Sequence, residues 1–178
     1  SNTAPTSEFK TEYYDSPNIR TDKDKSYALG HALKNERKAI ILHYTAYENS
    51  PKGDADLHAQ YMTPNRDNSH VVILGNGTKR IYASPEQVTF HAGESKWKGR
   101  DNVNDFGIGV EFQNSGIGKL TDAQVKSGAE YITDLMDRYN LKLEEIGWST
   151  VSVDQIKRNK RIQDKRDACP TGTASKTT

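Results

Sequence analysis

HAGESKWKGRDNVNDFGIGVEFQN, residues 91–114, carries the strongest structural information in this chain. Its second half predicts a buried strand over residues 107–112, because a short, β-rich apolar run is typical of a strand covered on both faces. Glu111 is the one carboxylate in that strand. Burying a carboxylate costs free energy, which a fold tolerates for a partner, a metal or a catalytic duty. Glu111 is therefore a candidate functional residue, and a solvent-facing position on an edge strand is the alternative.

The rest of the chain alternates between patterns typical of strands and of helices. Strands are predicted at 39–44, at 69–74 and 78–83 around Gly75-Asn76-Gly77, and at 143–148. Helices are predicted at 26–38, at 54–62 and, from a capping box at Thr121–Gln124, to about residue 139. On that last helix the predicted core face comprises Val125, Ala129, Ile132, Leu135, Met136 and Tyr139. The expected fold class is α/β, a single domain with a mixed central sheet flanked by helices.

Length and composition limit the classes of function. With 178 residues, one domain with one core is expected, and we expect a monomer. A net charge of +1 gives no general attraction to nucleic acid, and no apolar run is long enough to span a bilayer. The predicted boundaries are a disordered lead-in or tag remnant at 1–12, the domain at 13–172 and a polar tail at 173–178.

Two residues far apart in the sequence are candidate metal ligands. His43 ends the predicted strand 39–44, and Cys169 precedes Pro170 near the end of the chain. Imidazole and thiolate are the ligands that zinc prefers, and a catalytic zinc site uses three protein ligands plus water. Taken singly, a histidine at a strand end is more often structural, and a lone cysteine can be an inert apolar residue.

The 91–114 segment resembles the zinc-dependent N-acetylmuramoyl-L-alanine amidases of the AmpD-like family, which is related to the peptidoglycan recognition proteins. The family's run W-H-A-G-x-S-x-W is similar to His91–Trp97, and its N-D-x-S-I-G-I-E is similar to Asn104–Glu111. Its H-x-T-A and A-C-P motifs are matched around His43 and Cys169, and its S-P-N segment at residues 16–18. The resemblance therefore runs from about residue 15 to 172 and implies the fold of that family.

The resemblance also implies a zinc site with one departure. His43 and Cys169 match the first and last zinc ligands, whereas Trp148 stands where the family has its middle histidine. An indole ring offers only an N–H donor and cannot bind zinc. Candidate replacements for this ligand are Asp154, Asp164, Asp167, His70 and His91, and the alternative is a site that holds no zinc.

The remaining roles follow from the same resemblance. Glu111 matches the family's acid/base, and Lys165 or Arg166 would stabilise the oxyanion, because Asp167 occupies the family's lysine position. The residues expected to line the substrate cleft are His91, Trp97, Arg100 and Asn104.

The implied substrate is peptidoglycan or a muropeptide fragment, cut between N-acetylmuramic acid and L-alanine of the stem peptide. The alternative is a non-catalytic protein that binds muropeptides without cleaving them. A cell-wall substrate favours the periplasm or the cell exterior over the cytoplasm.

Overall fold

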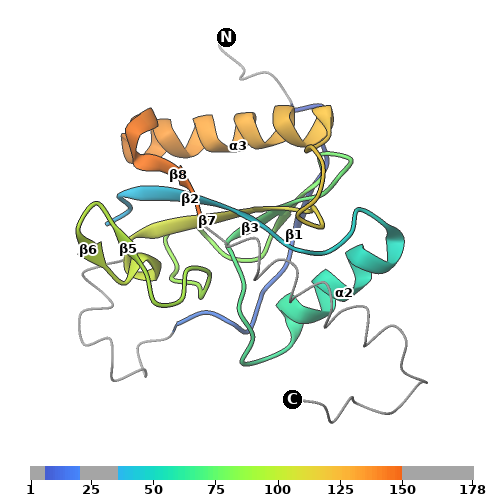
Figure 1. Cartoon of the computed structure of the whole chain (residues 1–178), viewed down its shortest axis with the longest axis horizontal. Helices are drawn as coiled ribbons and strands as arrows, with labels where there is room; N and C mark the ends of the chain where they lie inside the picture. The colour runs from blue at the N-terminus through green and yellow to red at the C-terminus, as the bar shows by residue number, and fades with distance from the viewer. Residues whose placement is uncertain (1–6, 21–35, 150–178) are drawn as a thin grey trace.

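The structure, a computed structural model, describes residues 7–20 and 36–149. A six-stranded sheet lies at the centre, in the order β1-β4-β3-β7-β2-β8. Helix α3 covers one face of the sheet and helix α2 lies over the other (Figure 1). Every neighbouring pair of strands is parallel except β3 and β4, which form an antiparallel hairpin. The predicted α/β fold with a mixed, helix-flanked sheet is thus confirmed.

The strands of this sheet are β1 (Thr11–Tyr13), β2 (Ala39–Tyr44), β3 (Val71–Ile73), β4 (Lys79–Ile81), β7 (Gly107–Phe112) and β8 (Ile146–Trp148). A separate hairpin joins β5 (Lys96–Trp97) to β6 (Arg100–Asp101), and the short 3-10 helices η2 (Val103–Asp105) and η3 (Leu143–Glu145) precede β7 and β8. Strands β2 and β7 are central and nearly all buried. Their apolar sequences suit parallel strands covered on both faces.

Helix α2 (Pro51–Met62) begins three residues earlier than predicted, at a proline that follows the N-cap Ser50. The Ser50 hydroxyl accepts the Gly53 N–H, which satisfies one of the free donors of the first turn. Leu57 and Tyr61 are the large side chains that α2 buries, and they pack with Val72 and Tyr82 on one face of the sheet. This helix therefore covers the β3 and β4 part of the sheet.

Helix α3 (Asp122–Tyr139) begins with the predicted capping box between Thr121 and Gln124. The predicted core face was partly wrong, because Val125 is 56% exposed and Ala129 is also exposed. The first turns instead bury Gln124, Ser127 and Gly128. At Gly128 a β-carbon would lie 2.6 Å from the Phe112 ring, so the small residue lets the helix approach the sheet closely.

The N-terminal segment corrects the predicted boundary at residue 13. Residues 11–13 form β1, which pairs with β4, and the Ser7 hydroxyl donates to Glu130 of α3. The fold therefore includes residues 7–12, while 1–6 lie outside the described residues. Most of the helix predicted at 26–38 also lies outside them, and residues 36–38 are not helical.

The last strand is shorter than the predicted 143–148, because η3 occupies its first three positions. Within the described ranges, no helix is both long and apolar enough to cross a membrane.

Candidate active site

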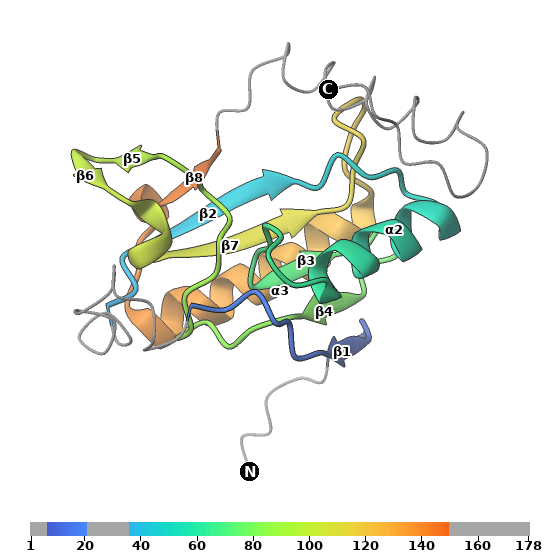
Figure 2. The ribbon, with the colours of Figure 1, turned by 90° about the horizontal axis from the view of Figure 1, so that it is seen from below.

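His43 and Glu111 lie side by side on the α2 face of the sheet. Strands β2 and β7 are parallel, and their register pairs His43 with Glu111. Side chains of paired residues point to the same face, and alternate residues along a strand share a face. The other face is packed against α3 through Ile40, Leu42, Ile108, Val110 and Phe112. The sheet therefore has two different faces. The chemical face carries His43 and Glu111 and is seen from the α2 side in Figure 2, and the opposite face packs against α3.

Glu111 is held between its neutral and charged forms near neutral pH. Burial is the main cause that raises the pKa of its carboxyl group to about 7; a hydrogen bond from Tyr61 lowers this pKa, and Asp67 adds a smaller increase. The Tyr61 hydroxyl on α2 donates this bond directly to Oε2 of Glu111. A carboxyl group with a pKa near the working pH can both take up and release a proton.

The imidazole of His43 is neutral and buried. Burial lowers the pKa of His43 to about 4. Its Nε2 lies 3.0 Å from Nδ1 of His91, and the two rings are nearly perpendicular, at 83°. This is the only hydrogen bond of the His43 ring to the described part of the chain, so its Nδ1 makes no such bond there and could bind a metal ion in the tautomer that has its hydrogen on Nε2.

His70 and His91 cannot serve as replacement ligands in this arrangement, because both nitrogens of each ring are occupied. Nδ1 of His70 accepts the Gly109 N–H at 3.0 Å, and its Nε2 donates to the Gln87 carbonyl at 2.7 Å. Burial lowers the pKa of His70 to about 3. Nε2 of His91 lies 3.2 Å from the Gly107 carbonyl oxygen. Burial lowers its pKa well below the usual value, and His43 and His70 lower it further.

The other predicted metal-site residues lie beyond the described part of the chain. These are Cys169, Lys165 and the three aspartates proposed as replacement ligands. Among residues 7–20 and 36–149, no group of three or more His, Cys, Asp or Glu side chains could hold a metal ion. The described residues fit zinc through one ligand, the free ring nitrogen of His43.

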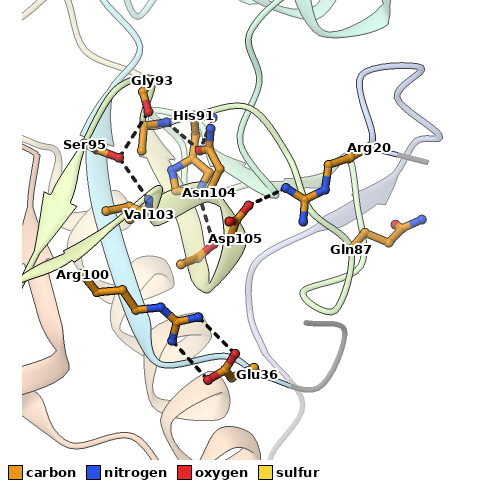
Figure 3. A network of polar contacts seen from close by, with 12 residues as sticks. Arg20, Glu36, Gln87, His91, Gly93, Ser95, Arg100, Val103, Asn104 and Asp105 are labelled. Carbon is orange, nitrogen blue, oxygen red and sulfur yellow. Dashed lines mark hydrogen bonds and ion pairs between the residues drawn. The ribbon is translucent and has the colours of Figure 1, made fainter. Parts of the chain in front are cut away.

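Figure 3 shows three of the four predicted substrate residues, His91, Arg100 and Asn104, with their polar contacts. Oδ1 of Asn104 accepts the backbone N–H groups of His91 and Ala92, at 3.0 and 2.9 Å. Ser95 accepts the Val103 N–H, so the loop closes on itself. Arg100 forms two hydrogen bonds of 3.1 Å with Glu36 and lies over the Phe106 ring. Both Asn104 and Arg100 therefore have partners within the protein.

Trp97 and Trp148 lie on opposite faces of the sheet. Trp97 packs next to Gly147 of β8, where a β-carbon would lie 2.2 Å from its ring, and it joins the cluster around Ile41 and Phe106. Trp148 stacks on Tyr44 and contacts Phe112, which lies on the α3 face. The Trp148 ring is therefore separated from His43 by the sheet itself.

Two functional features were missed at the sequence level. Tyr61 lies within the helix predicted at 54–62 but was given no role there, because its contact with Glu111 joins residues 50 positions apart. Gly109 leaves the space for His91, whose Cγ would lie 2.6 Å from a β-carbon there. The spacing of Gly107, Gly109 and Glu111 by two residues is the pattern that could have placed all three on one face.

Comparisons with known proteins find similar sequences and similar folds. A family model described as N-acetylmuramoyl-L-alanine amidase matches residues 33–172. The amidase AmiD of Escherichia coli is 30% identical over 125 residues, which cover 61% of this chain and 43% of AmiD. The 1,6-anhydro-N-acetylmuramyl-L-alanine amidase AmpD of Haemophilus influenzae is 36% identical over 74 residues, 42% of this chain and 40% of AmpD. The chain thus spans less than half the length of these relatives.

Solved structures share the fold. A selenomethionine derivative of AmpD has a TM-score of 0.59 at 19% identity, covering 79% of this chain and 81% of that one. Escherichia coli AmiD, in complex with anhydro-N-acetylmuramic acid-L-Ala-D-gamma-Glu-L-Lys, has a TM-score of 0.54 at 22% identity, covering 76% and 65%. Because the family model covers most of the sequence, this chain belongs to the N-acetylmuramoyl-L-alanine amidase family.

Proposed function

We propose that this protein hydrolyses the amide bond between N-acetylmuramic acid and L-alanine in muropeptides or peptidoglycan. The observation that carries the proposal is the pairing of His43 with Glu111 on one face of the sheet. One residue offers a neutral ring nitrogen for a metal, and the other a carboxyl group with a pKa of about 7. The structure of AmiD in complex with the substrate anhydro-N-acetylmuramic acid-L-Ala-D-gamma-Glu-L-Lys supports this substrate class.

The proposed cofactor is zinc, with His43 and Cys169 as ligands. When bound, zinc supplies a Lewis acid for the amide carbonyl and makes water a better nucleophile at neutral pH. Asp154, Asp164 and Asp167 remain the candidates for the third ligand. The cell envelope is the proposed location, because that is where the wall is assembled.

Glu111 is the proposed acid and base of the reaction. As a carboxylate it takes a proton from the attacking water, and as the neutral acid it gives that proton to the leaving amine of L-alanine. Tyr61 holds the carboxyl group in place through its hydrogen bond to Oε2. Lys165 is proposed to stabilise the negative charge that develops on the carbonyl oxygen.

Trp97 and Arg100 are proposed to contact the substrate, and His91 and Asn104 are proposed to hold the loop that carries them. Arg100 would exchange Glu36 for a carboxylate of the stem peptide, which is a like-for-like exchange of bidentate partners. His91 and Asn104 contribute through the loop that they hold together.

The test combines zinc content with cleavage, using full-length protein purified without chelator. We expect stoichiometric zinc and release of the stem peptide from a muropeptide. Glu111→Gln should lower the cleavage rate about 10²–10⁴-fold, the usual contribution of a general acid–base, while the zinc content stays unchanged. Glu144→Gln, at an exposed position on η3, is the matched control and should cleave normally.

Two results would contradict the proposal. Normal cleavage by Glu111→Gln would remove Glu111 from the mechanism. Muropeptide binding by a zinc-free protein that cleaves nothing would instead identify a non-catalytic binding protein.

A further inference from the structure

The hydrogen bonds of His91 determine which of its nitrogens carries the proton. Nε2 lies 3.2 Å from the carbonyl oxygen of Gly107. A carbonyl oxygen can only accept a hydrogen bond, so Nε2 must be the donor. A neutral imidazole carries one hydrogen, so with Nε2 as the donor the Nδ1 of His91 has a lone pair and no hydrogen.

This assignment sets the tautomer of His43. Nε2 of His43 lies 3.0 Å from the bare Nδ1 of His91, so the hydrogen of that bond belongs to His43. A neutral His43 with its hydrogen on Nε2 keeps a lone pair on Nδ1. In the opposite arrangement, a bare Nε2 of His91 would face the Gly107 oxygen, and two acceptors would repel each other at 3.2 Å.

The loop and strand around His91 are shaped to hold this ring. Gly109 provides the space, since any larger residue would bring its β-carbon to 2.6 Å from Cγ of His91. Asn104 fixes the backbone of His91 from the other side through Oδ1. Residues from β7 and η2 thus hold the imidazole of His91 next to that of His43.

We propose that His91 is a positioning residue that keeps His43 in the Nε2–H tautomer and so presents Nδ1 of His43 as the metal ligand. This inference rests on the proposed zinc-dependent function only for the identity of the metal. Histidine ligands commonly donate their second N–H to an outer partner, which fixes the tautomer and the ring orientation. Here the partner is itself a histidine, anchored by a backbone carbonyl.

The first measurement needs no metal. Long-range ¹H–¹⁵N correlation spectra of the chelator-treated full chain report which nitrogen of each neutral histidine carries the hydrogen. We expect Nε2–H for both His43 and His91. An Nδ1–H tautomer of His43 in the wild-type protein would overturn the proposal.

The second measurement uses variants of His91. His91→Phe keeps a ring but removes the acceptor, so His43 should populate both tautomers and zinc affinity, measured by chelator competition, should fall about 10–100-fold. His91→Gln can accept from His43 and donate to Gly107, and should restore most of the affinity. His58→Phe is the matched control, because His58 lies between Tyr14 and Tyr82 on another part of this face.

The outcomes separate this inference from the proposed function. An unchanged His43 tautomer and zinc affinity in His91→Phe would overturn the positioning role even if the enzyme is active. If the wild-type protein binds no zinc, the proposed function fails, while the tautomer spectra of His43 still decide the role of His91.

Discussion

Glu111 occupies a strand position where a carboxyl group is held close to its neutral form. The pKa of about 7 arises mainly from burial, and Tyr61 limits the rise by donating a hydrogen bond. In the unfolded chain the same group has a pKa near 4.5. The folded state therefore binds the proton more tightly than the unfolded state does, and folding and protonation of Glu111 are linked.

This linkage predicts a pH-dependent effect of Glu111→Gln on stability. In the wild-type protein, protonated Glu111 contributes to the free energy of unfolding. This contribution is fully present below pH 4.5 and is lost as the pH rises through 7, because the folded state then holds a buried carboxylate. The amide never ionises, so the variant should gain roughly 2–3 kcal/mol relative to wild type between pH 5 and pH 8. Urea unfolding of both proteins in chelator measures this gain. A stability difference that does not change with pH would show that Glu111 is solvated.

At the residue scale, the sequence predicted functional roles for His43 and Glu111, and the structure places these two residues side by side on neighbouring strands. The roles themselves stay predictions. Their supporting residues were not predictable in the same way. The Tyr61 hydroxyl reaches Glu111 from a helix, and Asn104, expected to face substrate, accepts two backbone N–H groups instead. Long-range contacts and backbone partners leave no local pattern in a sequence.

Helix α3 depends at its first turn on one threonine with two roles. The Thr121 hydroxyl accepts the Gln124 N–H at 3.0 Å and donates to the Gly75 carbonyl at 2.6 Å. It therefore caps the helix and attaches the cap to the turn between β3 and β4. Both bonds are made by one oxygen atom.

Thr121→Ala should therefore cost more than the loss of an ordinary cap. A lost cap costs typically about 1 kcal/mol, and the unpaired Gly75 carbonyl adds to it, so about 1–3 kcal/mol is expected. Thr121→Ser keeps the hydroxyl and should stay within about 0.5 kcal/mol of wild type. Equilibrium urea unfolding at pH 7 compares the three proteins, and equal stability of the alanine and serine variants would contradict this role.

Elements with a strong local pattern were predicted well, and those formed by pairing were not. The capping box and the apolar strands β2 and β7 are visible in the sequence. Strand β1 has the sequence Thr-Glu-Tyr, with little apolar character, and it exists because its backbone pairs with β4. The core face of α3 was misjudged where Gly128 and Ser127, rather than large apolar residues, meet the sheet.

On the scale of the whole molecule, burial against the chemical face favours the neutral form of three imidazoles, those of His43, His70 and His91. The pKa values of His43, His70 and His91 are all lowered by burial. Each contributes stability that is present above the unfolded pKa of 6.5 and is lost as the pH falls through the folded pKa. Glu111 acts in the opposite direction over the same pH range.

Acid should consequently unfold this protein early. Near pH 5.5, unfolding takes up about three protons on these histidines and releases about one from Glu111, a net uptake of about two. Stability should then fall by roughly 3 kcal/mol per pH unit on acidification. Urea unfolding between pH 6.5 and 5 measures the slope in metal-free protein. A flat or rising stability would show that the histidines are not held neutral.

The alternation of β8 bears on how a metal site could be engineered here. Trp148 is paired with Leu42 and stacks on Tyr44, whereas Gly147 turns toward Trp97. A histidine introduced at position 148 would lie, as Trp148 does, on the face of the sheet that packs against α3. The alternation assigns position 149 to the side of His43, and the Ser149 N–H already donates to the Leu42 carbonyl at 2.8 Å. A designer adding a second imidazole ligand should therefore choose Ser149→His over Trp148→His.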